Sequence, residues 1–341
     1  MKATNLGQMK WKRYGLGVIL LHVIGIGLLL FSVKDHPSLL GLSILAYTLG
    51  LRHAFDADHI AAIDNTVRKL LQQGTNPTGV GFYFSLGHSS VVCCMAIIIA
   101  VAANWAGANL PQMQEIGGVI GASISGIFLV LMGLLNLFIL LQIYQVFREM
   151  RGAGHNEQYL EELLQSRGIM ARIMKPLFRF VNRSWHVYPI GFLFGLGFDT
   201  ASEVALMALS AGAAGNAIPI SGILALPFLF ASGMSLMDTA DGVFMTTAYR
   251  WAFRTPLRKV YYNLSVTAIS VVAALFIGLI ELAQVLTPKL GMNDPLSLWI
   301  QNLDLGSLGY MLVALFLLSW VISYGIWRYM RIEERWSPPA L

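Results

Sequence analysis

The stretch R-H-A-F-D-A-D-H-I-A-A-I-D-N, residues 52–65, ends an apolar run that begins near Leu39 and otherwise has the composition of a membrane-spanning helix. It contains six ionisable side chains: Arg52, His53, Asp56, Asp58, His59 and Asp64. An ionisable group at bilayer depth costs at least a few kcal/mol, so such groups normally face a polar pathway or a partner. A single structural ion pair needs only two of them. The excess indicates a functional site within the membrane.

The residue types in this stretch favour a metal ion. Imidazole and carboxylate together are ligands for borderline divalent metals such as nickel, cobalt or zinc, whereas Mg²⁺ and Ca²⁺ prefer oxygen. On an ideal helix His53, Asp56 and His59 lie on one side. Asp58 faces the opposite way, so either it orients a ligand from another helix or the helix is unwound here, as at the ion sites of transporters.

The composition predicts an all-α polytopic membrane protein. The chain has 341 residues, of which 56% are hydrophobic and 12% charged, and its mean hydropathy is +0.64. We expect one transmembrane domain over residues 1–341 with eight spans, each long enough to cross about 30 Å of hydrocarbon. The basic start, Met1–Arg13, resembles a signal peptide, but no A-x-A cleavage site follows it, so we interpret the first apolar run as a retained span. The predicted spans lie near 15–33, 39–64, 79–103, 118–147, 187–213, 219–248, 260–286 and 307–330.

Basic residues are distributed unevenly between the predicted spans. With both termini in the cytoplasm, the inner segments hold 20 of the 23 Lys and Arg residues, with Arg68 and Lys69 counted in one inner loop. This asymmetry predicts a multi-pass protein with both ends inside. It also accounts for the net charge of +5, which therefore gives no indication of a nucleic-acid partner. The longest inner segment, residues 148–185, is expected to be a basic cytoplasmic loop.

Three further spans carry polar groups. The third reads F-S-L-G-H-S-S and contains His88; the fifth reads G-L-G-F-D-T-A-S-E and contains Asp199 and Glu203; the sixth reads G-M-S-L-M-D-T-A-D-G and contains Asp238 and Asp241. Carboxylates three or four residues apart share a helix face and repel each other. A proton, a metal ion or an arginine must therefore compensate them.

Two pairs of segments resemble each other. Residues 50–56 resemble 195–199, and F-Y-F-S-L-G-H-S at 82–89 resembles F-L-F-A-S-G-M-S at 228–235. Spans two and three would then correspond to spans five and six. An offset of three spans reverses the orientation, which predicts an inverted repeat with a binding site at the repeat interface, as in many transporters.

Four motifs together resemble those of the NiCoT nickel/cobalt permeases. They are R-H-A-F-D-A-D-H-I in span two, L-G-H-S-S-V-V in span three, L-G-F-D-T-A-S-E in span five and G-M-S-L-M-D-T-A-D in span six. The resemblance implies uptake of Ni²⁺, and sometimes Co²⁺, across a bacterial cytoplasmic membrane by a secondary transporter that is not an enzyme and has no cofactor. It assigns the metal site chiefly to the first four of the following residues: His53, Asp56, Asp58, His59, His88, Asp199, Glu203, Asp238 and Asp241.

Several alternatives stay open from the residues alone. The substrate could be another divalent metal such as Zn²⁺ or Mn²⁺, and a metalloenzyme or a sensor are the competing classes. The H-E-x-x-H pattern of an intramembrane metalloenzyme does not occur, and the longest loop is short for a sensor's output domain. No phosphate-binding G-x-x-x-x-G-K-[ST] loop occurs and no ATPase subunit is evident from the sequence, so the expected energy source is a gradient or another chain.

Arg52 is expected to balance charge at the site. A fixed positive charge one residue before His53 repels a metal ion unless carboxylates neutralise it. On the ideal wheel Arg52 lies beside Asp56, which predicts an Arg52–Asp56 pair in the empty protein. A metal ion would compete with Arg52 for that carboxylate and so couple its binding to a shift of the segment.

Overall fold

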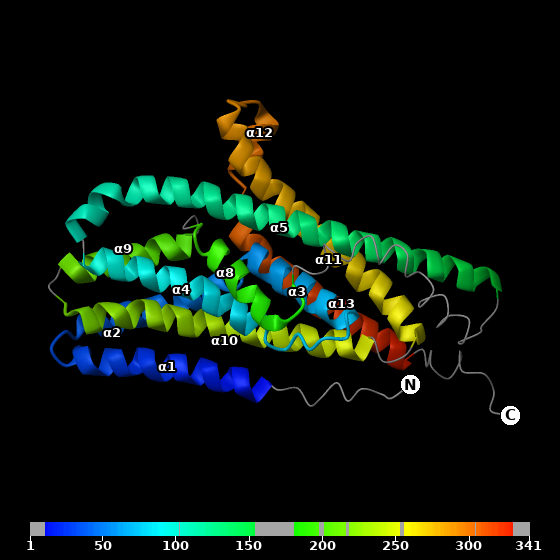
Figure 1. The fold of residues 1–341 in the computed structure, drawn as a ribbon, viewed down its shortest axis with the longest axis horizontal. Helices are drawn as coiled ribbons and strands as arrows, with labels where there is room; N and C mark the ends of the chain where they lie inside the picture. The colour runs from blue at the N-terminus through cyan, green and yellow to red at the C-terminus, as the bar shows by residue number, and fades with distance from the viewer. Residues whose placement is uncertain are drawn as a thin grey trace.

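The structure is a computed structural model that describes residues 11–101, 103–153, 181–197, 201–215, 218–252, 256–303 and 305–329. These residues form helices and no strands, as predicted (Figure 1). The elements are α1 (Trp11–Val33), α2 (Ser38–His53), α3 (Ala57–Gln72), α4 (Val80–Val101), α5 (Ala103–Ala153), η1 (Ser184–Val187), α8 (Tyr188–Phe194), α9 (Ala201–Gly215), α10 (Ile220–Ala252), α11 (Pro256–Lys289), α12 (Pro295–Gln301) and α13 (Leu305–Tyr329).

Five helices are long and apolar enough to cross a bilayer, and the bent pair α2–α3 makes six if it is counted as one span. Their spanning segments are Trp11–Val33, Val80–Ile98, Glu115–Leu141, Ile220–Arg250 and Val266–Lys289. Shorter apolar helices, Ser202–Gly215 and Leu308–Ile322, lie where the fifth and eighth spans were predicted. The described residues thus support up to six spans by length and composition, and the total of eight stays a prediction. Of the predicted loop 148–185, the first residues belong to α5, and residues 154–180 lie outside the described part.

The outer helices expose apolar side chains. Only 17% of the α1 span is buried, and Leu16, Leu30 and Phe31 are among its exposed residues. Figure 1 shows α1 at one edge of the bundle, where it packs along α10. An apolar side chain that faces lipid needs no cover from protein, so this face fits a helix within hydrocarbon.

The second span is broken at the motif that the sequence singled out. Helix α2 ends at His53, α3 begins at Ala57, and the two axes differ by 52°. Asp56 has an extended backbone with ψ 142° and precedes the first residue of α3. Backbone hydrogen bonds from Phe55 to Arg52 and from Asp56 to His53, both 2.9 Å, close the turn. The unwound helix, one of the two explanations offered for Asp58, is therefore confirmed.

The fifth predicted span is also interrupted. It consists of the short helices η1 and α8, then a turn at Gly195–Gly197, then α9. The backbone NH groups of Gly195 and Gly197 donate to Gly191 and Phe194 across this turn. Residues 198–200, including Asp199, lie outside the described part of the chain. Both broken spans thus have their interruption at the polar motif.

Glycines let two pairs of helices approach backbone to backbone around these breaks. A Cβ at Gly50 of α2 would lie 2.1 Å from the carbonyl oxygen of Phe230 in α10. A Cβ at Gly191 of α8 would lie 2.0 Å from the carbonyl oxygen of Phe84 in α4. Any side chain at either position would clash, so glycine is required for this packing, as is common between membrane helices.

The close contacts between these helices are reciprocal between the two predicted repeats. In the predicted repeat, α4 corresponds to α10 and the helix before the first break corresponds to the helix before the second. Gly87 of α4 packs against the backbone of Tyr188 in α8, and Gly233 of α10 packs against the backbone of Tyr47 in α2. Each first-repeat helix therefore packs on the second-repeat counterpart of its own neighbour. These reciprocal contacts support the repeat predicted from the sequence.

Arg68 and Lys69 lie in a helix and not in the predicted loop. Both belong to α3 and are only 0% and 2% exposed. Helix α3 continues to Gln72 and is covered by α5, α10, α11 and α13. Counting basic residues takes no account of burial, so the count could not distinguish a loop arginine from one packed inside the bundle.

Candidate metal site

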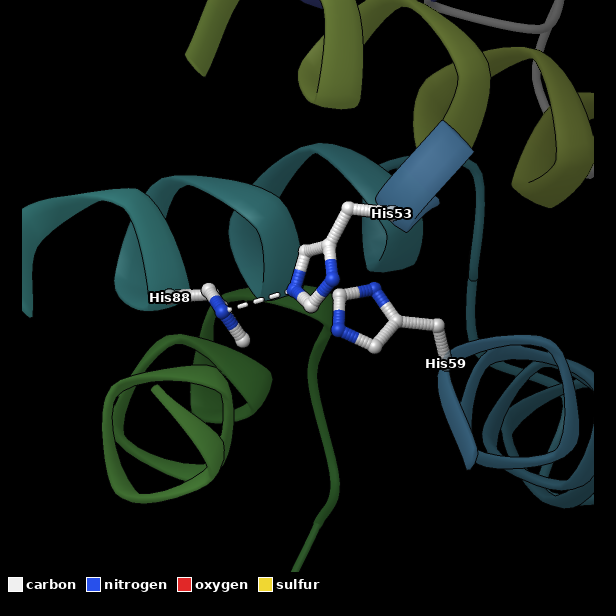
Figure 2. Close-up of side chains that lie close together, drawn as sticks. All are labelled: His53, His59 and His88. Atoms are coloured by element: carbon white, nitrogen blue, oxygen red, sulfur yellow. Dashed lines mark hydrogen bonds between the residues drawn. The ribbon is translucent and has the colours of Figure 1, made fainter. Parts of the chain in front are cut away.

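Three histidines from three helices meet in the bundle interior (Figure 2). His53 is the last residue of α2, His59 lies in the first turn of α3, and His88 lies in α4. One ring nitrogen from each lies within 4.8 Å of the others, and the residues are only 1%, 1% and 3% exposed. Neutral imidazole is the commonest protein ligand for metal ions. We call these three residues the histidine cluster.

His53 is held between a carboxylate and a second histidine. Its Nδ1 lies 2.8 Å from Oδ2 of Asp56, and its Nε2 lies 3.0 Å from Nε2 of His88. The turn between α2 and α3 makes this possible, because it brings Asp56 back toward His53. A carboxylate at one ring nitrogen fixes the proton there and leaves the lone pair of the other nitrogen for a metal ion.

His88 contacts the carboxylate of Glu203 as well as His53. Nε2 of His88, the nitrogen that faces His53, also lies 2.8 Å from Oε1 of Glu203. Glu203 lies in the first turn of α9 and is 1% exposed. The motifs of spans two, three and five therefore meet at one point, as the resemblance implied for these residues.

Asp238 of α10 supplies a further carboxylate. Its Oδ2 lies 3.5 Å from Nδ1 of His59, a separation within ion-pair range but longer than most N–H···O hydrogen bonds. Asp238 is 1% exposed, and neither of its carboxylate oxygens has a hydrogen-bond partner among the described residues. A buried carboxylate in this condition needs a compensating positive charge.

Two phenylalanines form walls of the cluster. The ring of Phe84 meets that of His59 edge-on, with centroids 4.7 Å apart, and Phe230 lies 5.6 Å from His53. Both phenylalanines are 0% exposed. They restrict the imidazole rings and exclude water, which strengthens electrostatic interactions inside the site.

Asp58 and Arg52, both predicted to act at the site, lie outside the histidine cluster. The carboxylate of Asp58 is partly buried and accepts a 2.9 Å hydrogen bond from the backbone NH of His59, within the first turn of α3. Arg52 is exposed. Among the described ion pairs, the partner of Asp56 is His53, and no Arg52–Asp56 pair occurs. The break after His53 removes the continuous helical register on which that pair was predicted.

Asp241 lies close to the cluster but outside it. It follows Asp238 by one turn of α10, and its buried Oδ2 has no hydrogen-bond partner among the described residues. The remaining predicted residue, Asp199, lies outside the described part of the chain.

A buried polar network between α3, α10 and α11 was not predicted from the sequence. We call it the Arg68 network: Arg68 and Asp64 of α3, Tyr249 of α10 and Ser270 of α11. The available signal was the spacing of Asp64 and Arg68, because opposite charges four residues apart pair on a helix. Counting Arg68 as a loop residue concealed it.

The chain is similar in sequence to known metal transporters. Residues 39–326 match the family described as "High-affinity nickel-transport protein". The nickel transporter NixA of Staphylococcus aureus is 58% identical over 97% of this chain and 98% of its own. The nickel transporter NicT of Mycobacterium tuberculosis is 45% identical over 98% of this chain and 93% of its own. The cobalt transport protein NhlF of Rhodococcus rhodochrous is 41% identical over 89% and 88%.

No solved structure matches the chain. The family match covers most of the sequence and includes every described residue of the histidine cluster. With relatives of this identity and coverage, the chain belongs to the family of high-affinity nickel-transport proteins.

Proposed function

We propose that this protein is a secondary transporter that carries Ni²⁺ into the cell across a bacterial cytoplasmic membrane, with the ion bound midway by the histidine cluster. The family supports transport of a divalent metal ion and the apolar helices support a multi-pass membrane protein. The gathering of basic residues in the predicted inner segments supports cytoplasmic termini.

The convergence of three buried histidine nitrogens within 4.8 Å carries the proposal, and the separation of His53 and His88 is compatible with one shared ion. Their Nε2 atoms are 3.0 Å apart. Two imidazole nitrogens bonded to one metal ion at about 2.1 Å, with a bond angle of about 90°, are also about 3.0 Å apart, whereas a tetrahedral angle gives about 3.4 Å. Right angles between ligands suit Ni²⁺, which takes square-planar and tetragonal sites of nitrogen and oxygen ligands. The same distance suits an N–H···N hydrogen bond, which a bound metal ion would replace.

The carboxylates complete the chemistry. Asp56 orients His53, Glu203 lies on His88, and Asp238 lies near His59. A divalent cation loses much of its hydration on entering a buried site, and that loss is offset only by ligands and negative charge inside the protein. The three carboxylates lie beside the histidines at the distances given above and so provide this charge.

Cobalt is a second candidate substrate. The relative from Rhodococcus rhodochrous is named a cobalt transport protein. Co²⁺ takes the same imidazole and carboxylate ligands as Ni²⁺, and it stands directly before nickel in the order of divalent affinities. Competition between the two ions therefore belongs in any uptake assay.

Reconstituted protein tests the function. Proteoliposomes that contain the full chain are expected to accumulate radiolabelled Ni²⁺ under an imposed pH or voltage gradient, with Co²⁺ as competitor. His59→Ala is expected to abolish accumulation. His22→Ala is the matched control, because His22 lies in α1 and contacts Tyr47 and the Val18 carbonyl instead of the cluster. Normal uptake by His59→Ala would remove His59 from the pathway.

A further inference from the structure

The Arg68 network lies along the same helices as the histidine cluster, farther toward the C-terminal end of α3. Nη2 of Arg68 lies 3.2 Å from Oδ2 of Asp64, and the same nitrogen donates to the hydroxyls of Tyr249 and Ser270. The hydroxyl of Tyr249 donates in turn to Oδ1 of Asp64. Both charged side chains are completely buried, at 0% exposed.

Packing alone does not explain a charged pair at this position. Taking a carboxylate and a guanidinium out of water costs several kcal/mol per ion, and a well-packed apolar pair is often equally stable or more so. The surroundings offer such packing, because Val67 and Leu70 of the same helix are each 0% exposed in the apolar core. A charged pair kept there points to a role in handling charge.

A stripe on α10 connects this network with the histidine cluster. Asp238, Asp241, Met245 and Tyr249 are spaced at three, four and four residues, which places them on one face of the helix. The first faces His59 and the last donates to Asp64. Asp241 lies between these two ends.

Helix α10 packs against α4 and also against α3 beside Asp241. A Cβ at the adjacent Gly242 would lie 3.8 Å from Ile63, the neighbour of Asp64 in α3. Asp241 lies one turn beyond Asp238 on α10, and Tyr249, two turns farther along the same face, is hydrogen-bonded to Asp64. Asp238, Asp241 and Asp64 therefore form a row of carboxylates that leads away from the histidines.

The guanidinium at the end of this row has spare hydrogen-bonding capacity. Nε and Nη1 of Arg68 have no hydrogen-bond partner among the described residues, although both atoms are buried. Oδ2 of Asp241 is buried and equally without such a partner. Arg68 and Asp241 thus both keep buried hydrogen-bonding atoms for which the described residues supply no partner.

We propose that Asp64, with Asp241, is a second binding position for the transported divalent metal ion, and that Arg68 occupies it as a tethered cation while the metal is at the histidine cluster. The proposal rests on the proposed nickel transport. A metal ion that leaves Asp238 moves to Asp241 and Asp64 as the guanidinium withdraws. Without a metal ion, Arg68 keeps the carboxylate of Asp64 neutralised and closes this end of the pathway to other cations.

Metal stoichiometry tests this proposal directly. Purified full-length protein in nanodiscs is titrated with Ni²⁺, and bound nickel is counted per chain. Wild-type protein is expected to bind one ion. Arg68→Gln removes the tethered cation and is expected to bind two, with the second held more weakly. Arg68→Lys keeps the positive charge and is expected to bind one, and so is the double variant Asp64→Asn/Arg68→Gln. A single ion in Arg68→Gln would overturn the proposal.

The double variant also protects the test against a folding failure. It replaces both charged groups by neutral, hydrogen-bonding side chains, so its folding does not depend on a buried unpaired charge. In proteoliposomes it is expected to transport nickel at least tenfold more slowly than wild type, while it still binds one ion. Wild-type transport by the double variant would equally overturn the proposal. Absence of nickel binding in the wild-type protein would instead contradict the proposed function.

Discussion

The Asp56→Asn substitution tests how the histidine cluster is organised. Asp56 is 8% exposed, and its Oδ2 lies 2.8 Å from Nδ1 of His53. Asparagine keeps the shape but loses the negative charge that fixes the proton on Nδ1. Removal of a carboxylate that orients a metal-binding histidine typically lowers metal affinity about 10- to 100-fold, which is about 1.4–2.8 kcal/mol.

The nickel dissociation constant of purified Asp56→Asn, measured by isothermal titration calorimetry, is therefore expected to rise by this factor. Asp294→Asn is the control, because Asp294 is a carboxylate on the N-cap of α12 with no contact to the cluster. An unchanged constant in Asp56→Asn would show that Asp56 does not orient His53. A rise of more than about a thousandfold, well above the usual effect of an orienting group, would instead place Asp56 on the metal ion itself.

Three further predictions concern Asp238, Gly50 and Asp294. Asp238→Asn should slow nickel uptake at least tenfold in proteoliposomes, because Asp238 lies 3.5 Å from His59. Glu281→Gln should leave uptake near wild type, because Glu281 belongs to α11, away from the cluster. Equal losses in both variants would contradict the assignment of Asp238 to the site. Gly50→Ala should lower the free energy of unfolding by about 1–3 kcal/mol through a clash with Phe230. Gly41→Ala in the same helix should leave it unchanged, because an added Cβ there meets nothing within 4 Å. Hydrogen bonds from the Ser297 side chain and backbone hold the pKa of the exposed Asp294 carboxyl below its ordinary value of 3.8. The cap of α12 should therefore be complete above about pH 4 and lost as the pH falls through the lowered pKa. Hydrogen exchange should show a matching fall in amide protection at Leu296 and Ser297, and constant protection would refute this.

The sequence predicted which helices contribute residues to the site better than it predicted the number of membrane spans. Apolar runs and intramembrane charges are strong local signals, so the helical architecture and the gathering of His53, His59, His88, Glu203 and Asp238 could be predicted before the geometry was known. Each of these residues lies in a short motif whose polar groups need a partner in hydrocarbon.

The details that depend on helix phase could not be predicted in the same way. The turn from Ala54 to Asp56 resets the register of the helix, which separates Arg52 from Asp56 and gives Asp58 a bond within its own helix. Charge counting likewise assigned Arg68 to a loop, although α3 buries it against α10 and α11. Both errors have one cause: a break or an extension of a few residues changes which face of a helix is buried, and the sequence pattern alone does not locate it.

Nickel K-edge X-ray absorption of the purified, nickel-loaded protein tests the central claim most directly. The account predicts nickel with imidazole ligands at about 2.1 Å, seen as the multiple-scattering pattern of two to three histidine rings. The pattern should weaken in His53→Ala, His59→Ala and His88→Ala but not in His22→Ala, since only the first three form the cluster. A spectrum with oxygen ligands alone, or one unchanged in all three variants, would contradict the binding of nickel at the histidine cluster.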